Sequence, residues 1–488
     1  MSIFRIFLLC CLMLSLTASA QDIHVSETEK VTSNFLSYRV IGKNSAGVLV
    51  YKHKRDRETI ELFDANMGLV RRKTLPVGEL NAETVKVELM EDDLIHFYSF
   101  KVKRMQYLAA QRINSKLEDV GPQVLLDSFD RRADENWTTH YITRAEGGTN
   151  VMAYRVRTRT GDLLAVQSQV FDPKLKAVWE GEVAFDEPDR LMTLTEAFLS
   201  QSGCISYVLL RDEGRLRADS YPHIVVHSKS PGGGFSRSEL ASEVPKRRIR
   251  EVKFAWDLAG DRMVAAGFFS DDNRPFAKGT FLAAHDPVIA QFTHSTFQDF
   301  QEGFVKSLTG KTSRKREEIP IYEIQDLVIR SDGGAMVSAE YVNESAEAYE
   351  YTDYDPYYGG YRTSTRYINY HEYEDIILFN MEPDGTVTWD DVIRKKQVSR
   401  EDYGKNSSYC LINARRKLFF IFNEEISYDT NVMQYSLEAG GELDRSALFN
   451  ANANEVMLVP RKAKQVAGNE IVIPSVYKNS LSFVKLTF

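Results

Sequence analysis

The sequence predicts an all-β protein folded as a single β-propeller of four-stranded antiparallel blades, with eight blades favoured and seven as the alternative. Three observations lead to this prediction. Short alternating runs rich in Val, Ile, Tyr and Phe are separated by Gly, Asp, Asn and Pro turns, and helical periodicity is scarce. A strand–turn–strand unit recurs about every fifty residues, which is the length of one blade. The sequence also ends partway through such a unit, and a strand near its start can complete it.

The repeat is most evident in its turns. The clearest copies turn near residues 66, 174, 384 and 440, and looser copies turn near residues 115, 230 and 286. Successive gaps between the turns are 49, 59, 56, 56, 98 and 56 residues. The one long gap contains a Tyr-rich insert whose length accounts for the excess. Such even spacing favours a propeller over a pair of β-sandwiches, and the looser copies leave seven blades open.

The two ends of the sequence indicate how the ring closes. An eighth turn would fall near position 496, but the sequence ends at Phe488 after a run, 481–488, that is typical of a third strand. We expect residues 22–30 to supply the fourth strand. A blade shared between both ends would leave no unpaired sheet edge.

Residues 1–20 have the pattern of a secretory signal. Arg5 gives the positive start, residues 6–16 are apolar, and Ala18-Ser19-Ala20 forms a cleavage site before Gln21. A lipid anchor on Cys10 is less favoured, because a large residue, Leu9, precedes it. We therefore expect a signal peptide at 1–20, a propeller domain at 21–488, and export to the periplasm, the cell envelope or the extracellular space. No later run is long and apolar enough for a membrane-spanning helix.

Charge and cysteine content narrow the possible partners. The net charge of −8 becomes −9 once Arg5 leaves with the signal, and a mildly acidic surface argues against a nucleic-acid partner. Cys204 and Cys410 are the cysteines beyond the signal. The repeat places them three blades apart, too far for a disulfide, so we expect two buried free thiols.

The Tyr-rich insert, residues 341–374 of the sixth blade, marks the candidate binding site. It contains ten of the 24 tyrosines and joins the second and third strands of its blade. We expect it to interrupt the strands as an irregular segment, on the propeller face where pockets usually open. Exposed tyrosines suit sugar rings, peptides and protein surfaces, whereas a self-packed cap or an unstructured loop are the alternatives. The candidate ligand-binding residues are Tyr349, Tyr351, Tyr354, Tyr357, Tyr358 and Tyr361.

No motif in the sequence predicts a catalytic residue, a metal ligand or a cofactor. The signatures of serine hydrolases, zinc proteases and phosphate-binding loops are missing. His223 and His227 would lie roughly 13 Å apart along a strand, too far for one ion. The acidic residues of the insert, such as Asp353 and Asp355, lack the spacing of a calcium loop. Asp384-Gly385 is an adjacent pair that predicts a tight hairpin turn, not the aspartate box of sialidases.

The insert and the hairpin after it resemble a group of uncharacterised secreted β-propeller-like proteins of Bacteroidetes. The shared features are a Tyr-rich segment, Asp375-Ile376-Ile377, Pro383-Asp384-Gly385 and Trp389, with Tyr409 and Phe419-Phe420-Ile421-Phe422-Asn423 following. The resemblance covers about eighty residues and implies a propeller-like fold. It implies no activity and no catalytic residues.

Two functions from different classes remain open at this stage. The favoured one is a non-enzymatic binding or scaffolding protein that engages a protein or a glycan of the cell envelope beneath the insert. The alternative is a carbohydrate-active or other hydrolase with its site at the mouth of the propeller channel. Carboxylates facing each other about 5–10 Å apart in the channel would favour the hydrolase.

Overall fold

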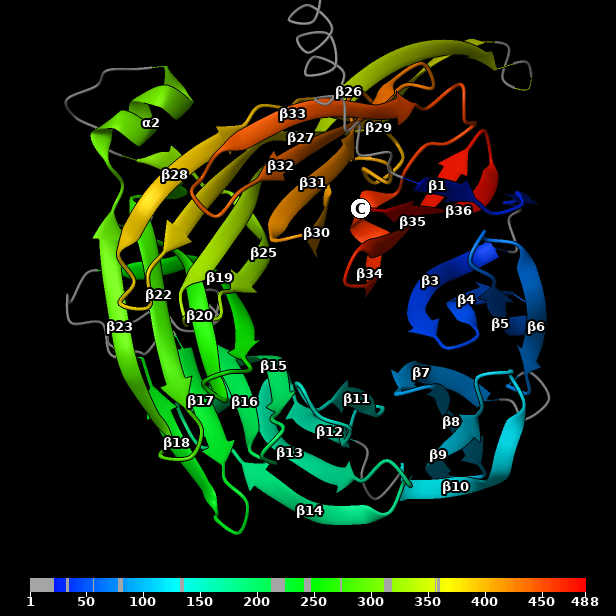
Figure 1. The fold of residues 1–488 in the computed structure, drawn as a ribbon, viewed down its shortest axis with the longest axis vertical. Helices are drawn as coiled ribbons and strands as arrows, with labels where there is room; N and C mark the ends of the chain where they lie inside the picture. The colour runs from blue at the N-terminus through cyan, green and yellow to red at the C-terminus, as the bar shows by residue number, and fades with distance from the viewer. Residues whose placement is uncertain are drawn as a thin grey trace, which may run out of the picture.

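A computed structural model describes residues 22–31, 35–55, 57–77, 82–131, 136–211, 224–240, 247–272, 274–310, 318–355, 357 and 360–488. The expected signal peptide, His223 and Tyr358 lie outside these residues. The described strands form eight four-stranded antiparallel units arranged in a ring, as Figure 1 shows. The chain is therefore an all-β propeller, and the prediction of eight blades is confirmed.

The strands of blades 1 to 4 follow one another along the chain. Blade 1 contains β3 (Phe35–Asn44), β4 (Gly47–Lys54), β5 (Arg57–Phe63) and β6 (Leu69–Leu75). Blade 2 contains β7 (Ala82–Met90), β8 (Asp93–Val102), β9 (Met105–Ile113) and β10 (Asp119–Asp130). Blade 3 contains β11 (Tyr141–Arg144), β12 (Val151–Arg159), β13 (Asp162–Phe171) and β14 (Ala177–Ala184). Blade 4 contains β15 (Thr193–Leu199), β16 (Ile205–Leu210), β17 (Ile224–Lys229) and β18 (Phe235–Glu239).

Blades 5 to 7 carry the additional elements. Blade 5 contains β19 (Arg248–Asp257), β20 (Arg262–Ser270), β22 (Gly279–Asp286) and β23 (Gln291–Asp299). Blade 6 contains β25 (Glu323–Ile329), β26 (Ala335–Asp355), β27 (Gly360–Met381) and β28 (Val387–Ile393), with β29 (Gln397–Arg400) paired to β27. Blade 7 contains β30 (Cys410–Ala414), β31 (Lys417–Asn423), β32 (Asn431–Leu437) and β33 (Leu443–Asn450). Short elements lie between blades: η1 (Asp189–Leu191), α2 (Glu302–Thr309), β24 (Ile319–Pro320) and η2 (Pro460–Lys462). Within blade 5, β21 (Phe276–Ala277) lies between β20 and β22 and pairs with β24.

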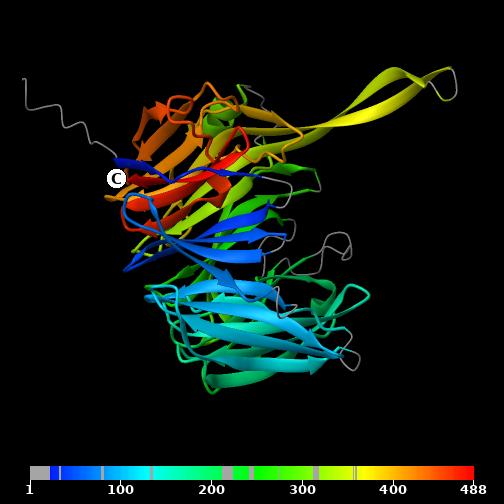
Figure 2. The same cartoon turned by 90° about the vertical axis from the view of Figure 1, so that its right-hand side faces the viewer.

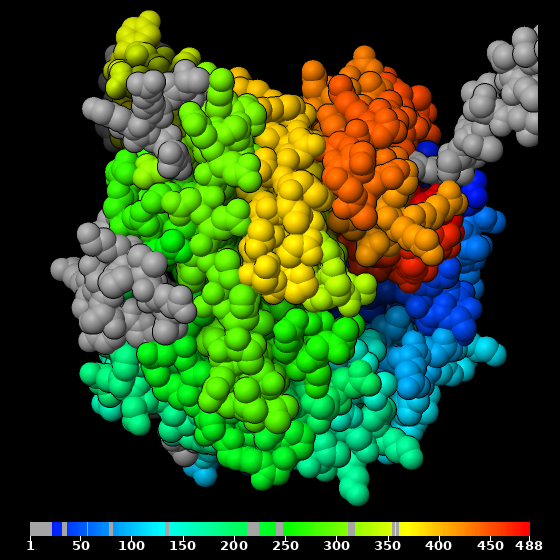
Figure 3. Space-filling model, turned by 60° about the vertical axis from the view of Figure 1, so that its left-hand side comes forward, coloured from blue at the N-terminus to red at the C-terminus, as the bar shows by residue number. Residues whose placement is uncertain are grey.

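Blade 8 closes the ring with strands from both ends of the chain. It contains β34 (Lys464–Ala467), β35 (Glu470–Tyr477), β36 (Ser480–Thr487) and β1 (Asp22–Val25). β1 runs antiparallel to β36, with Asp22 opposite Thr487 and Val25 opposite Val484, and β2 (Glu29–Lys30) continues along the same strand. In Figure 3 the red C-terminal blade lies beside the blue first blade. The expected closure is confirmed.

Each predicted turn joins the third and fourth strands of a blade, as the repeat required. The backbone shows why the turn recurs. Met67, Leu117 and Leu175 have φ of 64°, 62° and 63°, and Gly385 and Gly441 occupy the equivalent position with φ of 83° and 97°. Each donates its N–H to the carbonyl three residues earlier. A non-glycine residue is strained in this conformation, but the Met and Leu side chains are buried at the ends of their blades, which offsets the strain.

The hydrophobic core is divided into layers between adjacent blades. Between blades 5 and 6, for example, Phe268 packs against Phe300 and Phe379, and Phe304 packs against Phe379 with the ring centroids 4.9 Å apart. Apolar burial of this kind, repeated around the ring, stabilises the propeller. Both cysteines are free and buried, as expected.

The expectation that the insert is an irregular segment is wrong. β26 and β27 continue through it as one antiparallel ladder from Ala335 opposite Met381 to Asp355 opposite Gly360. Both faces of this ladder are polar, so the alternation that reveals a half-buried strand is absent from the sequence. Figure 2 shows the two strands extending beyond the blades as a projecting ribbon, so they form no cap over the channel. We call residues 344–369 the ribbon.

Candidate functional site

The ribbon exposes tyrosines to solvent on both of its faces. Side chains of β26 from Glu344 to Asp353 are all exposed, and Tyr349 and Tyr351 retain 57% and 42% of their surface. Because side chains alternate along a strand, Tyr349 and Tyr351 share one face. Large exposed aromatic side chains in an ordered element are typical of a surface that binds a partner.

The face with Tyr349 and Tyr351 carries charged side chains as well as aromatic rings, the arginines Arg362 and Arg366 together with Glu347 and Asp353. Arg366 lies opposite Tyr349 in the ladder, and Ile368 lies two residues further along β27 on the same face. These side chains, with Arg400 and Glu401, line a hollow of about 520 Å³. The Arg400 guanidinium stacks 5.0 Å from the centroid of the Tyr370 ring. Among the described residues, neither Arg366 nor Arg400 forms an ion pair with a carboxylate, so both charges remain available to a ligand.

The six predicted tyrosines do not form one cluster in the structure. Tyr349 and Tyr351 lie together in the hollow. Tyr354 is opposite Tyr361 near the tip of the ribbon, Tyr357 and Tyr361 are exposed, and Tyr358 lies outside the described residues. The residues that sequence reasoning missed are Arg366, Ile368 and Arg400. A hairpin register drawn through the insert would have placed the first two beside the tyrosines, but nothing in the sequence indicates Arg400.

A buried ion pair lies at the base of the ribbon, within blade 6. The Glu340 carboxylate lies 2.6 Å from the Lys395 ammonium, and both side chains are inaccessible. Lys395 also donates to the Tyr373 carbonyl and to Gln397, while Ser408 donates to Glu340 at 2.5 Å. Burial raises the pKa of Glu340 and lowers the pKa of Lys395. The network holds β26, β27 and β29 in one arrangement.

Both long edges of the ribbon lack a further strand in the described residues. β25 pairs with β26 only as far as Glu340, and β29 pairs with β27 only over residues 370–373. The unpaired N–H and C=O groups beyond these points are a template for another strand. The hollow lies where β29 ends, beside the open edge of β27.

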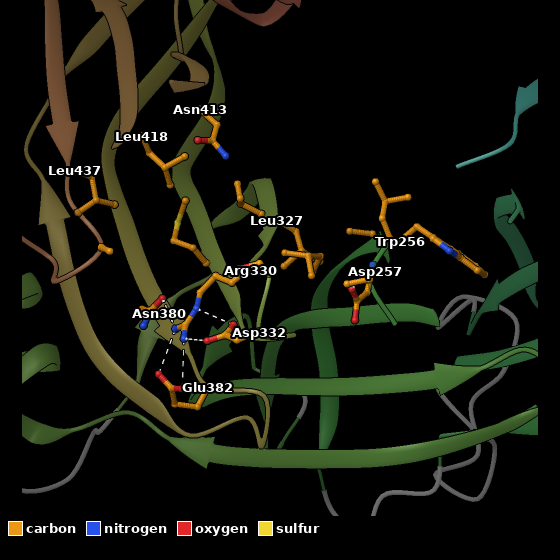
Figure 4. A pocket seen from close by; sticks show the side chains of 18 of the residues that line it. Trp256, Asp257, Leu327, Arg330, Asp332, Asn380, Glu382, Asn413, Leu418 and Leu437 are labelled. Atoms are coloured by element: carbon orange, nitrogen blue, oxygen red, sulfur yellow. Dashed lines mark hydrogen bonds and ion pairs between the residues drawn. The ribbon is translucent and has the colours of Figure 1, made fainter. Parts of the chain in front are cut away.

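A second, larger hollow of about 1130 Å³ lies on the opposite face of the propeller. It is bordered by the turns after β19, β25 and β27, at the ends of the blades away from the ribbon. Trp256, Leu327, Leu418 and Leu437 give it an apolar wall (Figure 4). Propeller pockets were expected on the face of the insert, and the larger hollow lies instead on the other face.

One charged cluster interrupts that apolar wall. Arg330 donates to Asp332, to Glu382 at 3.2 Å and to Asn380 at 3.1 Å (Figure 4). These partners satisfy the guanidinium within the protein and raise its pKa. We therefore assign the cluster to holding the β25–β26 turn, and assign it no role in binding.

The channel wall of blades 3 to 6 carries carboxylates on successive inner strands. Burial raises the pKa of Glu196, and Glu146 raises it further. Burial also raises the pKa of Glu251 to about 7, and the neighbouring Glu323 adds to the effect. The hydrolase alternative therefore has candidate carboxylates, although sequence reasoning named none of them.

The described residues contain neither a membrane-spanning helix nor a metal-binding cluster. None of the described helices is long and apolar enough to cross a membrane. In the same residues, no group of three or more His, Cys, Asp or Glu side chains is placed to hold a metal ion.

Comparisons with known proteins identify no family. No protein-family model matches the chain, and no curated protein matches it. Among solved structures, the polysaccharide lyase Uly1 is 10% identical with a TM-score of 0.40, covering 83% of this chain and 90% of the lyase. A prolyl endopeptidase is 12% identical with a TM-score of 0.38; 92% of this chain matches, but only 55% of the endopeptidase is covered. A Bacteroides caccae protein of unknown function is 12% identical with a TM-score of 0.29, covering 74% of this chain and 94% of that protein. The fold assignment rests on the strand pairing of this chain.

Proposed function

We propose that the chain is an exported, envelope-associated binding or scaffolding protein that uses the ribbon to dock a protein partner, without catalysing a reaction. The observation that carries the proposal is an ordered two-stranded ribbon that projects beyond the blades with exposed tyrosines and open edges. A two-stranded hairpin is marginally stable in water, and a third strand would stabilise it. The ribbon thus supports recognition by strand addition.

The side chains along the open edge of β27 indicate what kind of partner would bind there. Arg362, Ser364 and Arg366 follow one another along the face that holds the hollow, with Asp353 opposite Arg362, and Arg400 lies at the end of the hollow. A strand added to this edge would place alternate side chains beside those guanidinium groups. Acidic side chains at alternate positions would form charge-assisted hydrogen bonds there, and Tyr349 and Tyr351 would pack on the backbone of the added strand. We therefore infer an extended acidic segment of an envelope protein as the partner. A glycan is the other outcome that the test below distinguishes.

Site-specific photocrosslinking in the native host tests the proposal. A photoreactive phenylalanine analogue replaces Tyr349 or Tyr351, with Tyr428, an exposed tyrosine of blade 7, as the matched control position. We expect one discrete protein adduct from the ribbon positions, and its loss when Arg366 and Arg400 are both changed to Glu. Identical adducts at Tyr428, or none at the ribbon positions, would contradict a protein-docking ribbon. An adduct that disappears on glycosidase treatment would instead identify a glycan.

The hydrolase alternative is favoured by one specific observation, the Glu251 carboxyl with its pKa near neutrality beside Glu323. Incubation with a panel of polysaccharides and peptides, comparing the wild type with Glu251→Gln, tests it. Turnover that the substitution abolishes would establish the alternative, and equal absence of turnover in both would leave the binding proposal standing.

A further inference from the structure

The two long edges of the ribbon carry opposite charge. Within residues 344–353, β26 has four carboxylates and no cation: Glu344, Glu347, Glu350 and Asp353. Within residues 360–370, β27 has two cations, Arg362 and Arg366, and no carboxylate. Like charges opposite one another on adjacent strands are destabilising. An acidic strand is therefore repelled from the edge of β26 and attracted to the edge of β27.

The residue that follows β29 shows which backbone groups of β27 face its open edge. Glu401 donates its N–H to the Asn369 carbonyl at 3.0 Å, and the Glu401 carboxylate accepts from the Asn369 N–H at 2.5 Å. Asn369 therefore directs both of its backbone groups toward this edge. The direction alternates along a strand, and the β26–β27 register is regular here. Tyr367, Thr365 and Thr363 consequently direct their N–H and C=O groups the same way.

Glu401 also marks where this open edge begins. Its φ of 52° lies in the left-handed region, and pairing of β29 with β27 ends just before it, at Tyr370. In the described part of the chain, no strand pairs with β27 on this side within residues 363–367. These residues are an open template for a strand, and the template starts beside the hollow that Glu401 helps to line.

The side chains beside the template differ between the two faces of the ribbon. On the face of the hollow, Arg366 lies opposite Tyr349, and the hollow is lined by two arginines and one carboxylate. On the other face, β27 presents the uncharged side chains of Thr363, Thr365 and Tyr367, and Tyr367 is 63% exposed. One face therefore suits an anion, and the other suits a neutral side chain.

Charged residues on a strand edge can also serve only to prevent aggregation. That explanation accounts for β26, whose carboxylates repel a second copy of the same edge. It does not account for β27, because Thr and Tyr favour β-strands and occupy the positions whose backbone groups point outward. The edge of β27 is suited to pairing with a strand, whereas the edge of β26 is protected from it.

We propose that residues 363–367 of β27 pair with an extended segment that places one acidic side chain in the hollow beside Arg366, between two β-branched or aromatic side chains. The inference rests on the docking function proposed for the ribbon and specifies its partner. The carboxylate forms a charge-assisted hydrogen bond with the guanidinium. The side chains on either side of it in sequence point to the other face, where they pack against Thr365 and Tyr367. A continuous acidic run would place charges on that face, so the partner has an apolar–acidic–apolar pattern.

Proline substitutions on the two edges test the pairing, with the photoreactive analogue at Tyr351 in the native host as the readout. Thr365→Pro removes an N–H that faces the edge of β27. Ala348 lies opposite Tyr367, so Ala348→Pro removes an N–H that faces the edge of β26 and is the matched control. Neither N–H belongs to the β26–β27 ladder, and proline is tolerated at such edge positions. We expect Thr365→Pro to lower the adduct yield by about tenfold or more, and Ala348→Pro to leave it within about twofold of the parent.

The result separates this pairing from docking itself. An adduct that survives Thr365→Pro, or that Ala348→Pro also abolishes, would overturn pairing at β27 while docking through ribbon side chains stands. No adduct at Tyr351 in the otherwise wild-type chain would remove both proposals.

Synthetic peptides test the side-chain pattern on the purified protein. The probe is fluorescein-labelled Ser-Thr-Val-Glu-Val-Thr-Ser, compared by fluorescence anisotropy with the same peptide carrying Gln in place of Glu. We expect saturable binding of the Glu peptide, and affinity lower by about tenfold for the Gln peptide and for the Arg366→Gln protein, because each change removes one partner of the charged pair. Equal affinity of the two peptides, or no saturable binding at millimolar concentration, would overturn the acidic position in the hollow.

Discussion

The two halves of the β26–β27 hairpin share one register yet occupy different environments. In the proximal half, residues 335–340 and 376–381 are buried between blades. In the ribbon, the same ladder continues with most of its side chains exposed. The β26–β27 hydrogen bonds run through both halves, whereas pairing with β25 and β28 and burial of apolar side chains occur in the proximal half. Since a hydrogen bond exchanged with water contributes little net free energy, the stability of blade 6 resides in the proximal half.

The largest effect on stability should come from removing Phe379, the aromatic side chain at the centre of the proximal half's packing. Phe379 is 2% exposed and contacts Phe268, Phe300 and Phe304. Phe379→Ala should lower the free energy of unfolding by about 3–5 kcal/mol, because it leaves a cavity. Urea denaturation followed by tryptophan fluorescence measures this. If Phe379→Ala lowered the free energy of unfolding as little as a ribbon tyrosine substitution does, the stability of blade 6 would not reside in the proximal half.

Breaking the buried Glu340–Lys395 ion pair at the junction of the two halves should have the second-largest effect on stability. Lys395→Met leaves the Glu340 carboxylate buried without its cation, at a cost of roughly 3 kcal/mol near neutral pH. In the variant, burial raises the pKa of Glu340 above its unfolded value, so the folded state binds the proton more tightly. The deficit relative to the wild type should therefore shrink as pH falls from about 8 to about 5. A deficit that is constant with pH would show that Glu340 is not the group left unpaired.

Shortening the ribbon should have a small effect on stability. Residues 346–369 can be replaced by Asn-Gly, which joins Ser345 to Tyr370, an existing cross-strand pair, by a two-residue turn. The free energy of unfolding should change by less than about 1 kcal/mol, because almost no apolar surface is lost. Differential scanning calorimetry checks this. A large loss would mean that the ribbon contributes to the core.

Single substitutions in the ribbon should have the smallest effect. Tyr349→Ser and Tyr351→Ser remove exposed rings and should each change the free energy of unfolding by no more than about 0.5 kcal/mol. The substitutions should instead weaken binding of the partner, because tyrosines buried in an interface contribute much of the binding free energy. Equilibrium unfolding and adduct yield, measured on the same variants, distinguish these outcomes.

The sequence was sufficient for the fold because the blades repeat a local signal. Turns that recur at a similar spacing and are rich in Asp, Asn and Gly reflect a backbone conformation that recurs among the blades. The sequence was insufficient for the ribbon because a strand exposed on both faces shows no hydrophobic alternation. Arg400 could not be predicted either, because it joins the hollow only through the pairing of β29 with β27.

The shared construction of blade 8 has a consequence for how the molecule comes into being. β1 is synthesised near the start of translation, and β36, its partner, near the finish. Until blade 8 forms, the apolar faces of blades 1 and 7 that pack against it remain exposed to solvent. Folding therefore waits for a single late docking event, and any factor that shields exposed strands during synthesis would act on this open intermediate.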